Sequence, residues 1–125
     1  MWDVEKCNNR YDHNAAGGGY DRYQTAPVAS YPAGVSPYGC QDMGGNVWDT
    51  CKDWYEELYY TQTPPGGWDN PQGPASSSTG TRSIRGGGWI YGICGDSACC
   101  DRCANRGKYY PDSGQNAIGI RVARS

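Results

Sequence analysis

The clearest alternation of apolar and polar residues lies at the C-terminal end of the chain. Ile118, Ile120 and Val122 are separated by single small or polar residues, which is the period-two pattern of a half-buried strand. Residues 82–89 also favour a strand, which runs into a glycine turn. Residues 90–101 between them show neither helical nor strand periodicity. A long irregular segment between two strands is typical of a functional surface or of disorder.

The rest of the chain predicts loops around one more structured region. Residues 2–24 are polar and interrupted by glycines, and residues 25–38 carry three prolines that favour extended, turning backbone. Residues 39–60 are the most structured part, because they hold large aromatic side chains, although periodicity leaves 53–60 open between a short helix and a strand end. Residues 61–80, rich in Pro, Gly and Ser, predict a surface loop. We find no repeat and expect one domain over 1–125.

The composition changes what such a core can be made of. The chain contains no Phe but has 11 Tyr, 5 Trp and 19 Gly. We therefore expect a thin core built on Trp and Tyr, with their polar ends paired. Such a chain needs further fastening from disulfides, metal or a partner.

Charge and hydropathy exclude two classes of partner. The net charge is −2, so nothing in the balance attracts nucleic acid or an anionic membrane over long range. No apolar run approaches the length of a membrane-spanning helix. We expect neither nucleic-acid binding nor membrane insertion, while the oligomeric state stays open.

The seven cysteines leave several alternatives open. An odd number leaves at least one unpaired within a monomer. Cys100 and Cys103 form a C-x-x-C pair, but the second pair that a structural zinc site usually needs is missing. His13, the only histidine, is typical of a solvated loop residue. Disulfides, free thiols and a zinc site all remain possible, and the cysteines do not decide the compartment.

Several segments occur in the order found in a known family. They are residues 25–32 (TAPVASYP), 38–49 (YGCQDMGGNVWD) with 53–55 (DWY), 70–74 (NPQGP), and 84–89 (IRGGGW) with 102–106 (RCANR), 111–112 (PD) and 118–122 (IGIRV). Together they resemble the C-terminal half of the formylglycine-generating enzyme, or sulfatase-modifying factor, family. The resemblance implies an α+β, loop-rich, C-type-lectin-like fold. We expect it to have short antiparallel strands and little helix, and to be shortened at the N-terminus.

The resemblance also implies two calcium sites, both built from oxygen atoms. One would use Asn8, Asn9, Asp21 and Tyr23, and the other would use Asp42, Gly45, Val47 and Asp49. Calcium binds several oxygens and accepts mixtures of carboxylates and carbonyls. The alternative is that Asp42 and Asp49 only cap turns.

Enzymes of the family hold copper with two cysteines, to which soft Cu(I) is suited. In this chain Tyr91 and Ala98 occupy those positions, whereas Cys94 and Cys99 keep the mutual spacing but are displaced. Gly88 also replaces a serine of the preceding turn. We therefore do not expect copper, and a copper-dependent oxidase acting on a sulfatase cysteine is the alternative function.

Another branch of the family comprises the variable proteins of diversity-generating retroelements, in which adenine-directed mutagenesis diversifies the C-terminal segment. Each residue of 90–101 can be encoded by a codon ending in C, as diversified AAC codons are. This interpretation predicts a display domain on a cell or virion surface whose segment 82–125 binds a protein or surface ligand. The exposed contacts would be Tyr91, Ile93, Asp96, Ser97, Asp101, Tyr109, Tyr110, Ser113 and Gln115. Arg106 and Arg121 would instead be structural.

Overall fold

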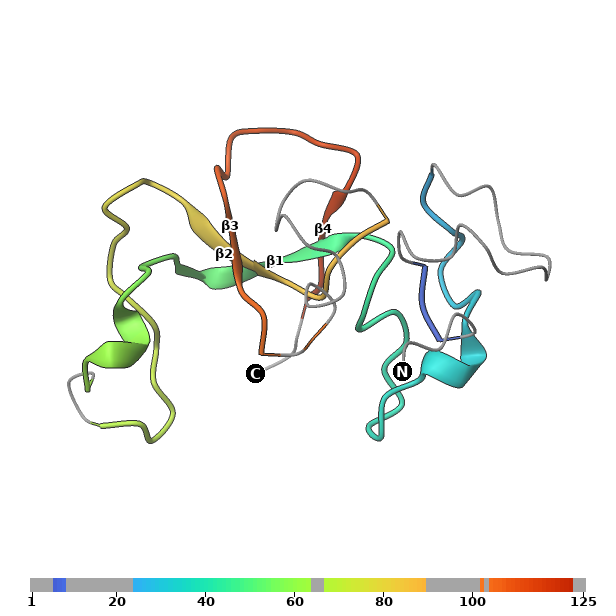
Figure 1. Ribbon diagram of the computed structural model, residues 1–125, viewed down its shortest axis with the longest axis horizontal. Helices are drawn as coiled ribbons and strands as arrows, with labels where there is room; N and C mark the ends of the chain where they lie inside the picture. Colours follow the sequence, from blue (N-terminus) through green and yellow to red (C-terminus); the bar gives the residue numbers. More distant parts are fainter. Residues whose placement is uncertain (1–5, 9–23, 64–66, 90–101, 103, 123–125) are drawn as a thin grey trace.

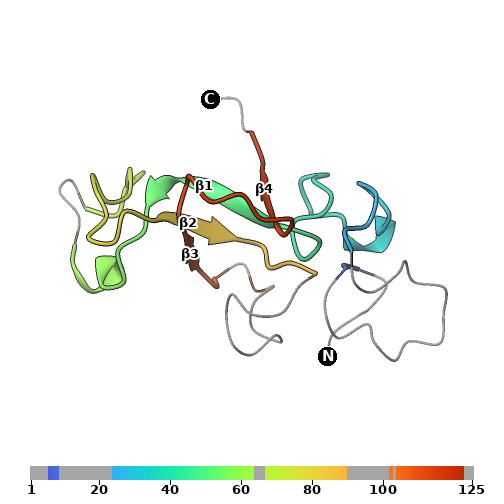
Figure 2. The ribbon, with the colours of Figure 1, turned by 90° about the horizontal axis from the view of Figure 1, so that it is seen from above.

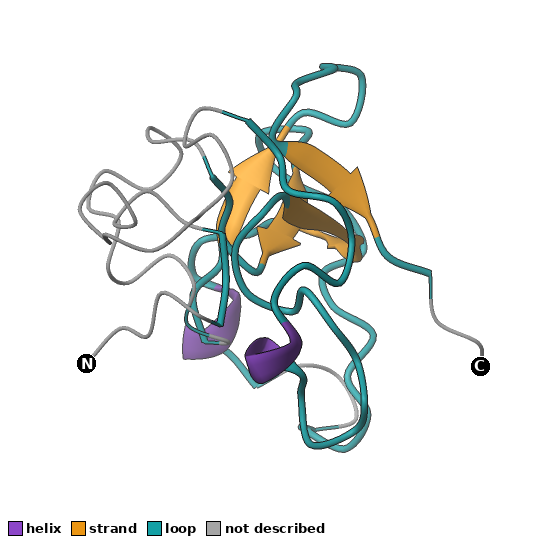
Figure 3. Cartoon of the chain, turned by 90° about the vertical axis from the view of Figure 1, so that its right-hand side faces the viewer, coloured by secondary structure: helices purple, strands orange, loops and turns teal. Residues whose placement is uncertain are grey.

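A computed structural model describes residues 6–8, 24–63, 67–89, 102 and 104–122. Its elements are two 3-10 turns, η2 (Pro32–Gly34) and η3 (Tyr59–Thr61), and four strands, β1 (Trp48–Trp54), β2 (Arg82–Arg85), β3 (Gly107–Tyr109) and β4 (Ile118–Ile120). Figure 3 shows the small sheet surrounded by loops, with only two short helical turns. The predicted loop-rich architecture with little helix is confirmed.

The strands form one sheet in the order β3-β2-β1-β4. β2 is antiparallel to both β1 and β3, but β1 and β4 are parallel. The prediction of antiparallel strands is therefore wrong for this pair. β3 and β4 lie at opposite edges of the sheet, and residues 110–117, the return between β3 and β4, lead the chain from one edge to the other (Figure 1).

The core is small and centred on one aromatic side chain. Trp48 on β1 is 1% exposed and Ile84 on β2 is 0% exposed, and Tyr109 and Ile118 pack against them. A Cβ atom on Gly107 would lie 2.9 Å from Cγ1 of Ile84, so β3 approaches this closely only because it carries no side chain there. The predicted reliance on large aromatic residues is confirmed.

The C-terminal strand forms as predicted, but its side chains are not buried as predicted. Ile118 packs on the core, whereas Ile120 is 79% exposed and Val122 is 86% exposed. The register explains the difference, because Ile118 lies opposite Trp48 and Ile120 lies opposite Thr50. Figure 2 shows the chain leading away from the sheet after β4. Apolar alternation predicted the strand, but the extent of the core decided which side chains are covered.

The region left open between helix and strand contains both. β1 ends at Trp54, a turn follows, and η3 begins at Tyr59. Residues 67–80 contain neither helix nor strand, as predicted for the surface loop. Within the described ranges, no helix is long and apolar enough to cross a membrane.

Candidate functional site

The glycine-rich turn before β1 is organised by one asparagine. Asn46 is 9% exposed and has a φ of 63°, a left-handed conformation that asparagine tolerates better than most residues. Its Oδ1 accepts hydrogen bonds from the Ala26 amide at 2.8 Å and from Nδ2 of Asn8 at 3.3 Å. Its Nδ2 donates to the Ala26 carbonyl at 3.1 Å. One side chain thus joins three segments that are distant in sequence.

The backbone of the same turn holds the start of the candidate ligand-binding segment. The amide of Gly45 donates to the Gly86 carbonyl at 2.6 Å, and the Asn46 carbonyl accepts from the Trp89 amide at 2.9 Å. A Cβ on Gly45 would lie 2.5 Å from the carbonyl oxygen of Asn8, and Gly45 has a φ of 77°. Glycine is therefore required at this position both for space and for backbone conformation.

Arg121 lies across the two aspartates predicted to bind calcium. Its Nε donates to Oδ2 of Asp49 at 3.1 Å, and its Nη2 donates to the Asp42 carbonyl at 2.9 Å. Oδ2 of Asp42 accepts from the Ala29 amide at 2.8 Å. The pair between Arg121 and Asp49 is partly exposed, so it contributes on the order of 1 kcal/mol or less to stability. Arg121 is therefore structural, as predicted.

The predicted ligands in this turn are carboxylate and carbonyl oxygens, which are the atom types that calcium binds. These bonds engage one oxygen of each carboxylate, Oδ2 of Asp42 and Oδ2 of Asp49. The carbonyls of Gly45 and Val47 belong to the same turn, and carbonyls with carboxylates are the ligands that calcium prefers. In the part of the chain that the structure describes, this turn included, no three His, Cys, Asp or Glu side chains gather, so two of the four predicted ligands are carboxylates and the others are backbone carbonyls.

The other predicted calcium site is only partly described. Nδ2 of Asn8 donates to the Gln24 carbonyl at 3.1 Å as well as to Asn46, and Asn8 is 6% exposed. Asn9, Asp21 and Tyr23 lie outside the described residues. For this site the structure therefore shows only that the Asn8 amide is buried and holds loop backbone.

The segment 90–101 begins and ends on neighbouring strands. β2 precedes it and β3 follows it, and Ile84 lies opposite Gly107 in their ladder. Nη1 of Arg85 donates to the Asn105 carbonyl at 3.0 Å. Nη2 of Arg106 donates to the Glu56 carbonyl at 2.7 Å. The base of the segment is thus closed by framework side chains and backbone carbonyls.

Arg106 is packed as well as hydrogen-bonded. Its guanidinium carbon lies 4.4 Å from the ring centre of Tyr55 and 4.7 Å from that of Tyr60. Arg85 also donates to the Tyr60 hydroxyl at 2.9 Å. Cation–π contacts of this kind add about 0.5–2 kcal/mol each. The prediction that Arg106 is structural is confirmed.

Three of the predicted contact residues lie exposed on the return between β3 and β4. They are Tyr110, Ser113 and Gln115. Tyr109 differs from the prediction, because its half-buried ring packs on the core and its hydroxyl is buried without a hydrogen-bond partner in the described structure. Tyr109 is the last residue of β3 and packs on the core, whereas Tyr110 follows the strand and is exposed. Tyr91, Ile93, Asp96, Ser97 and Asp101 lie outside the described residues.

Two cysteines of the described ranges, Cys40 and Cys51, are free thiols, the first exposed and the second half-buried, and Cys7 is buried. Burial raises the pKa of the Cys51 thiol above its ordinary value, and the nearby charge of Asp53 raises it further. Cys51 is therefore a poor nucleophile. Cys94 and Cys99, on which the alternative function depends, lie outside the described residues.

Sequence reasoning missed Asn46, the residue with the most consequential side-chain contacts. The signal was present, because Asn follows two glycines and Asn adopts left-handed backbone more readily than other residues with a Cβ. The sequence alone could not show that its amide would meet Ala26.

The chain is similar to known proteins in both sequence and fold. It is 37% identical over 125 residues to the formylglycine-generating enzyme of Streptomyces coelicolor, covering 98% of this chain but only 36% of that enzyme. Variable protein 1 of Treponema denticola has the same fold, with a TM-score of 0.64 and 23% identity over 93% of this chain and 34% of that one.

PvdO of Pseudomonas aeruginosa also shares the fold, with a TM-score of 0.67 and 24% identity over 96% of this chain and 40% of that one. These likenesses establish the small C-type-lectin-like fold. The chain spans about a third of the length of the curated enzyme. The sequence profile of the sulfatase-modifying factor enzyme 1-like domain matches residues 2–125, and the chain therefore belongs to that family.

Proposed function

We propose that this chain is a ligand-binding display domain whose segment 82–125 is diversified by a retroelement and contacts a protein or cell-surface ligand. The observation that carries the proposal is the closed base of the segment. β2 and β3 pair directly, and the bonds of Arg85 and Arg106 at the base use carbonyl acceptors. Substitutions within 90–101 therefore leave these two bonds unchanged.

The exposed return between β3 and β4 supports the same function. The indole Nε1 of Trp89 donates to the Asn116 carbonyl at 3.4 Å, which joins this return to the start of the segment. Tyr110 is 58% exposed on it. Tyrosine gives a large contact area at low entropic cost, and Ser113 and Gln115 add adaptable hydrogen bonds. The fold shared with a variable protein agrees with this use of the surface.

The alternative is a copper-dependent oxidase of the formylglycine-generating type. The relative from Streptomyces coelicolor favours it. The residues of this chain do not fit copper where the family motif would hold it, since Tyr91 and Ala98 occupy those positions. The turn has diverged as well, because a Cβ on Gly88 would lie 2.9 Å from Cδ1 of Trp48, so a serine there would displace the ring.

One genomic comparison and one biochemical comparison test the proposal. We expect a near-identical copy of the DNA encoding 82–125 close to the gene, differing from it at adenines. We also expect a variant with alanine at Tyr91, Ile93, Asp96, Ser97 and Asp101 to keep its melting temperature within about 4 °C, which is roughly 1 kcal/mol for a chain of this size.

The matched control is Arg106→Ala, which removes a bond at the base and two ring contacts, and which we expect to lower the melting temperature by more than the five-site variant. Equal losses for the two variants would contradict the proposal. Stoichiometric Cu(I) binding that is lost in Cys94→Ser and Cys99→Ser would instead support the oxidase.

We further propose that calcium stabilises the turn formed by Asp42, Gly45, Val47 and Asp49. One carboxylate oxygen of each aspartate and the turn carbonyls supply the ligands, and Arg121 keeps its bond to the other oxygen of Asp49. Calcium there would fix the same turn that holds Gly86 and Trp89. Its role would be structural, in support of the display surface.

A further inference from the structure

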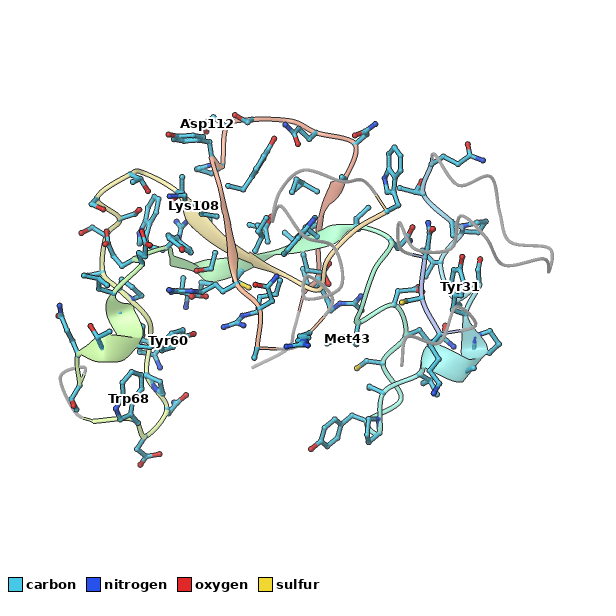
Figure 4. All side chains as sticks on the ribbon, viewed as in Figure 1. Tyr31, Met43, Tyr60, Trp68, Lys108 and Asp112 are labelled. Carbon is cyan, nitrogen blue, oxygen red and sulfur yellow. The ribbon has the colours of Figure 1, made fainter. Side chains whose placement is uncertain are left out.

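We propose that a second site, away from the display surface, binds one neutral hexose unit of a carbohydrate. The site is a cleft of about 340 Å³ between the end of β1, η3 and the loop of residues 70–73. This volume lies within the range of small-molecule sites. Tyr60 and the neighbouring Trp68 mark this end of the molecule in Figure 4, far from Asp112 on the return between β3 and β4.

The polar groups of the cleft are available to a ligand. Lys52, Asp53 and Asn70 line it, and none of their side chains makes a hydrogen bond or ion pair with another described residue. Asp53 is half-buried, and a half-buried carboxylate without a partner favours a ligand that donates hydrogen bonds. The charges of Lys52 and Asp53 are opposite, so the cleft favours a neutral ligand with several hydroxyls over an ion.

The apolar side of the cleft is aromatic and held in place. The rings of Tyr59 and Tyr60 line it, and each lies about 6 Å from the ring of Trp68, at 5.9 Å and 6.1 Å between centres. Arg106 packs on Tyr60, and Arg85 donates to its hydroxyl. Fixed aromatic faces beside hydrogen-bonding groups suit a ring with a C–H face and a hydroxyl edge, as in a hexose.

At one edge of the cleft, the loop of residues 70–73 packs closely against the end of β1 at a glycine. A Cβ on Gly73 would lie 2.5 Å from Cβ of Asp53, and Gly73 has a φ of 79°. Only glycine lets the loop approach the end of β1 this closely. The cleft is therefore formed by the packing of the chain itself, and it owes nothing to residues 90–101.

The test uses the complete chain and three probes, the methyl glycosides of glucose, galactose and mannose. We expect at least one to shift the amide NMR signals of Gly67, Trp68 and Gly73 with millimolar affinity, as expected of a ligand with few atoms. Asp53→Asn and Trp68→Ala should weaken binding about tenfold or more, since the first removes the carboxylate of the cleft and the second removes the ring against which Tyr59 and Tyr60 pack. Tyr38→Ala, which removes a tyrosine that is 93% exposed and belongs to neither site, should bind as the parent chain does.

Several results would overturn the inference. They are the absence of shifts with all three glycosides at concentrations on the order of 50 mM, shifts confined to other regions, and binding that Asp53→Asn and Trp68→Ala leave unchanged. Tighter binding of a blocked triproline peptide at the same amides would assign the cleft to peptides instead. If either variant loses its dispersed spectrum, Lys52→Gln, which keeps a long side chain, replaces it with the same expected loss.

Discussion

Replacing Asn46 by alanine should destabilise the domain strongly, because its side chain holds the turn before β1 in place. The substitution removes three side-chain hydrogen bonds, two with Ala26 and one with Asn8. Ala26 is 6% exposed, so its amide is left without a partner where water cannot replace the lost bond. A buried unsatisfied group costs about 1–3 kcal/mol.

The backbone adds a second cost. Asn46 has a φ of 63°, and alanine pays about 1–2 kcal/mol in the left-handed region. The two effects together predict a loss of about 2–5 kcal/mol in the free energy of unfolding. Since small domains are stable by only about 5–15 kcal/mol, this is a large fraction of the total.

Two further variants separate the contributions. Asn70 also has a positive φ, 46°, but it is exposed and its side chain makes no hydrogen bond among the described residues. Asn70→Ala should therefore report the backbone cost alone, about 1 kcal/mol. Asn46→Gly removes the same hydrogen bonds without the backbone cost, so it should be less destabilising than Asn46→Ala by about that amount.

The assay is urea unfolding of the reduced chain, followed by tryptophan fluorescence and by circular dichroism to check that both transitions coincide. The reasoning is refuted if Asn46→Ala and Asn70→Ala lose the same stability within about 0.5 kcal/mol, the scatter of ordinary surface substitutions. Equality would mean that the bonds to Ala26 contribute nothing net.

Tyr109→Phe should leave stability unchanged or raise it by up to about 1 kcal/mol, because it removes a buried hydroxyl that has no partner; a clear loss in urea unfolding would contradict this. The hydrogen bonds from Ser78 hold the pKa of Glu56 below its ordinary value of 4.5. Its carboxylate therefore stabilises the fold above about pH 4.5, and this contribution is lost as pH falls through the lower folded pKa. The stability difference between the parent and Glu56→Gln should shrink over that range, and a constant difference would argue against it. Calcium at 100 times its dissociation constant should stabilise the chain by about 2.7 kcal/mol, which a rise in melting temperature would report. Asp49→Asn should reduce that rise, and no rise at millimolar calcium would dismiss the site.

Local pattern predicted much of the fold. The strand at Ile118–Ile120, the loop of 67–80 and the aromatic core centred on Trp48 all follow from periodicity and composition. The parallel pairing of β1 with β4 did not, because pairing direction depends on where the return of 110–117 delivers the chain. No local pattern in that stretch encodes its path across the sheet.

Side-chain burial was predictable only where a neighbour could be foreseen. Tyr109 and Tyr110 are adjacent tyrosines, and composition alone gives both the same role as exposed contacts. Their positions in and after β3 separate them, one on the core and one 58% exposed. Asp42 and Asp49 show the same limit, since no local pattern identifies them as the partners of Arg121.

The hydrogen bonds at the base of segment 90–101 are compatible with the ligand-binding role proposed for it, because their acceptors do not depend on side-chain identity. The acceptors there are backbone carbonyls of Asn46, Glu56, Asn105 and Asn116. A carbonyl is present whatever side chain the residue carries, so it accepts the bond after almost any substitution. The donors of these hydrogen bonds are few. They belong to Arg85, Trp89 and Arg106, which lie outside 90–101. Under the proposed function, change within the segment alters ligand contacts and leaves these bonds in place.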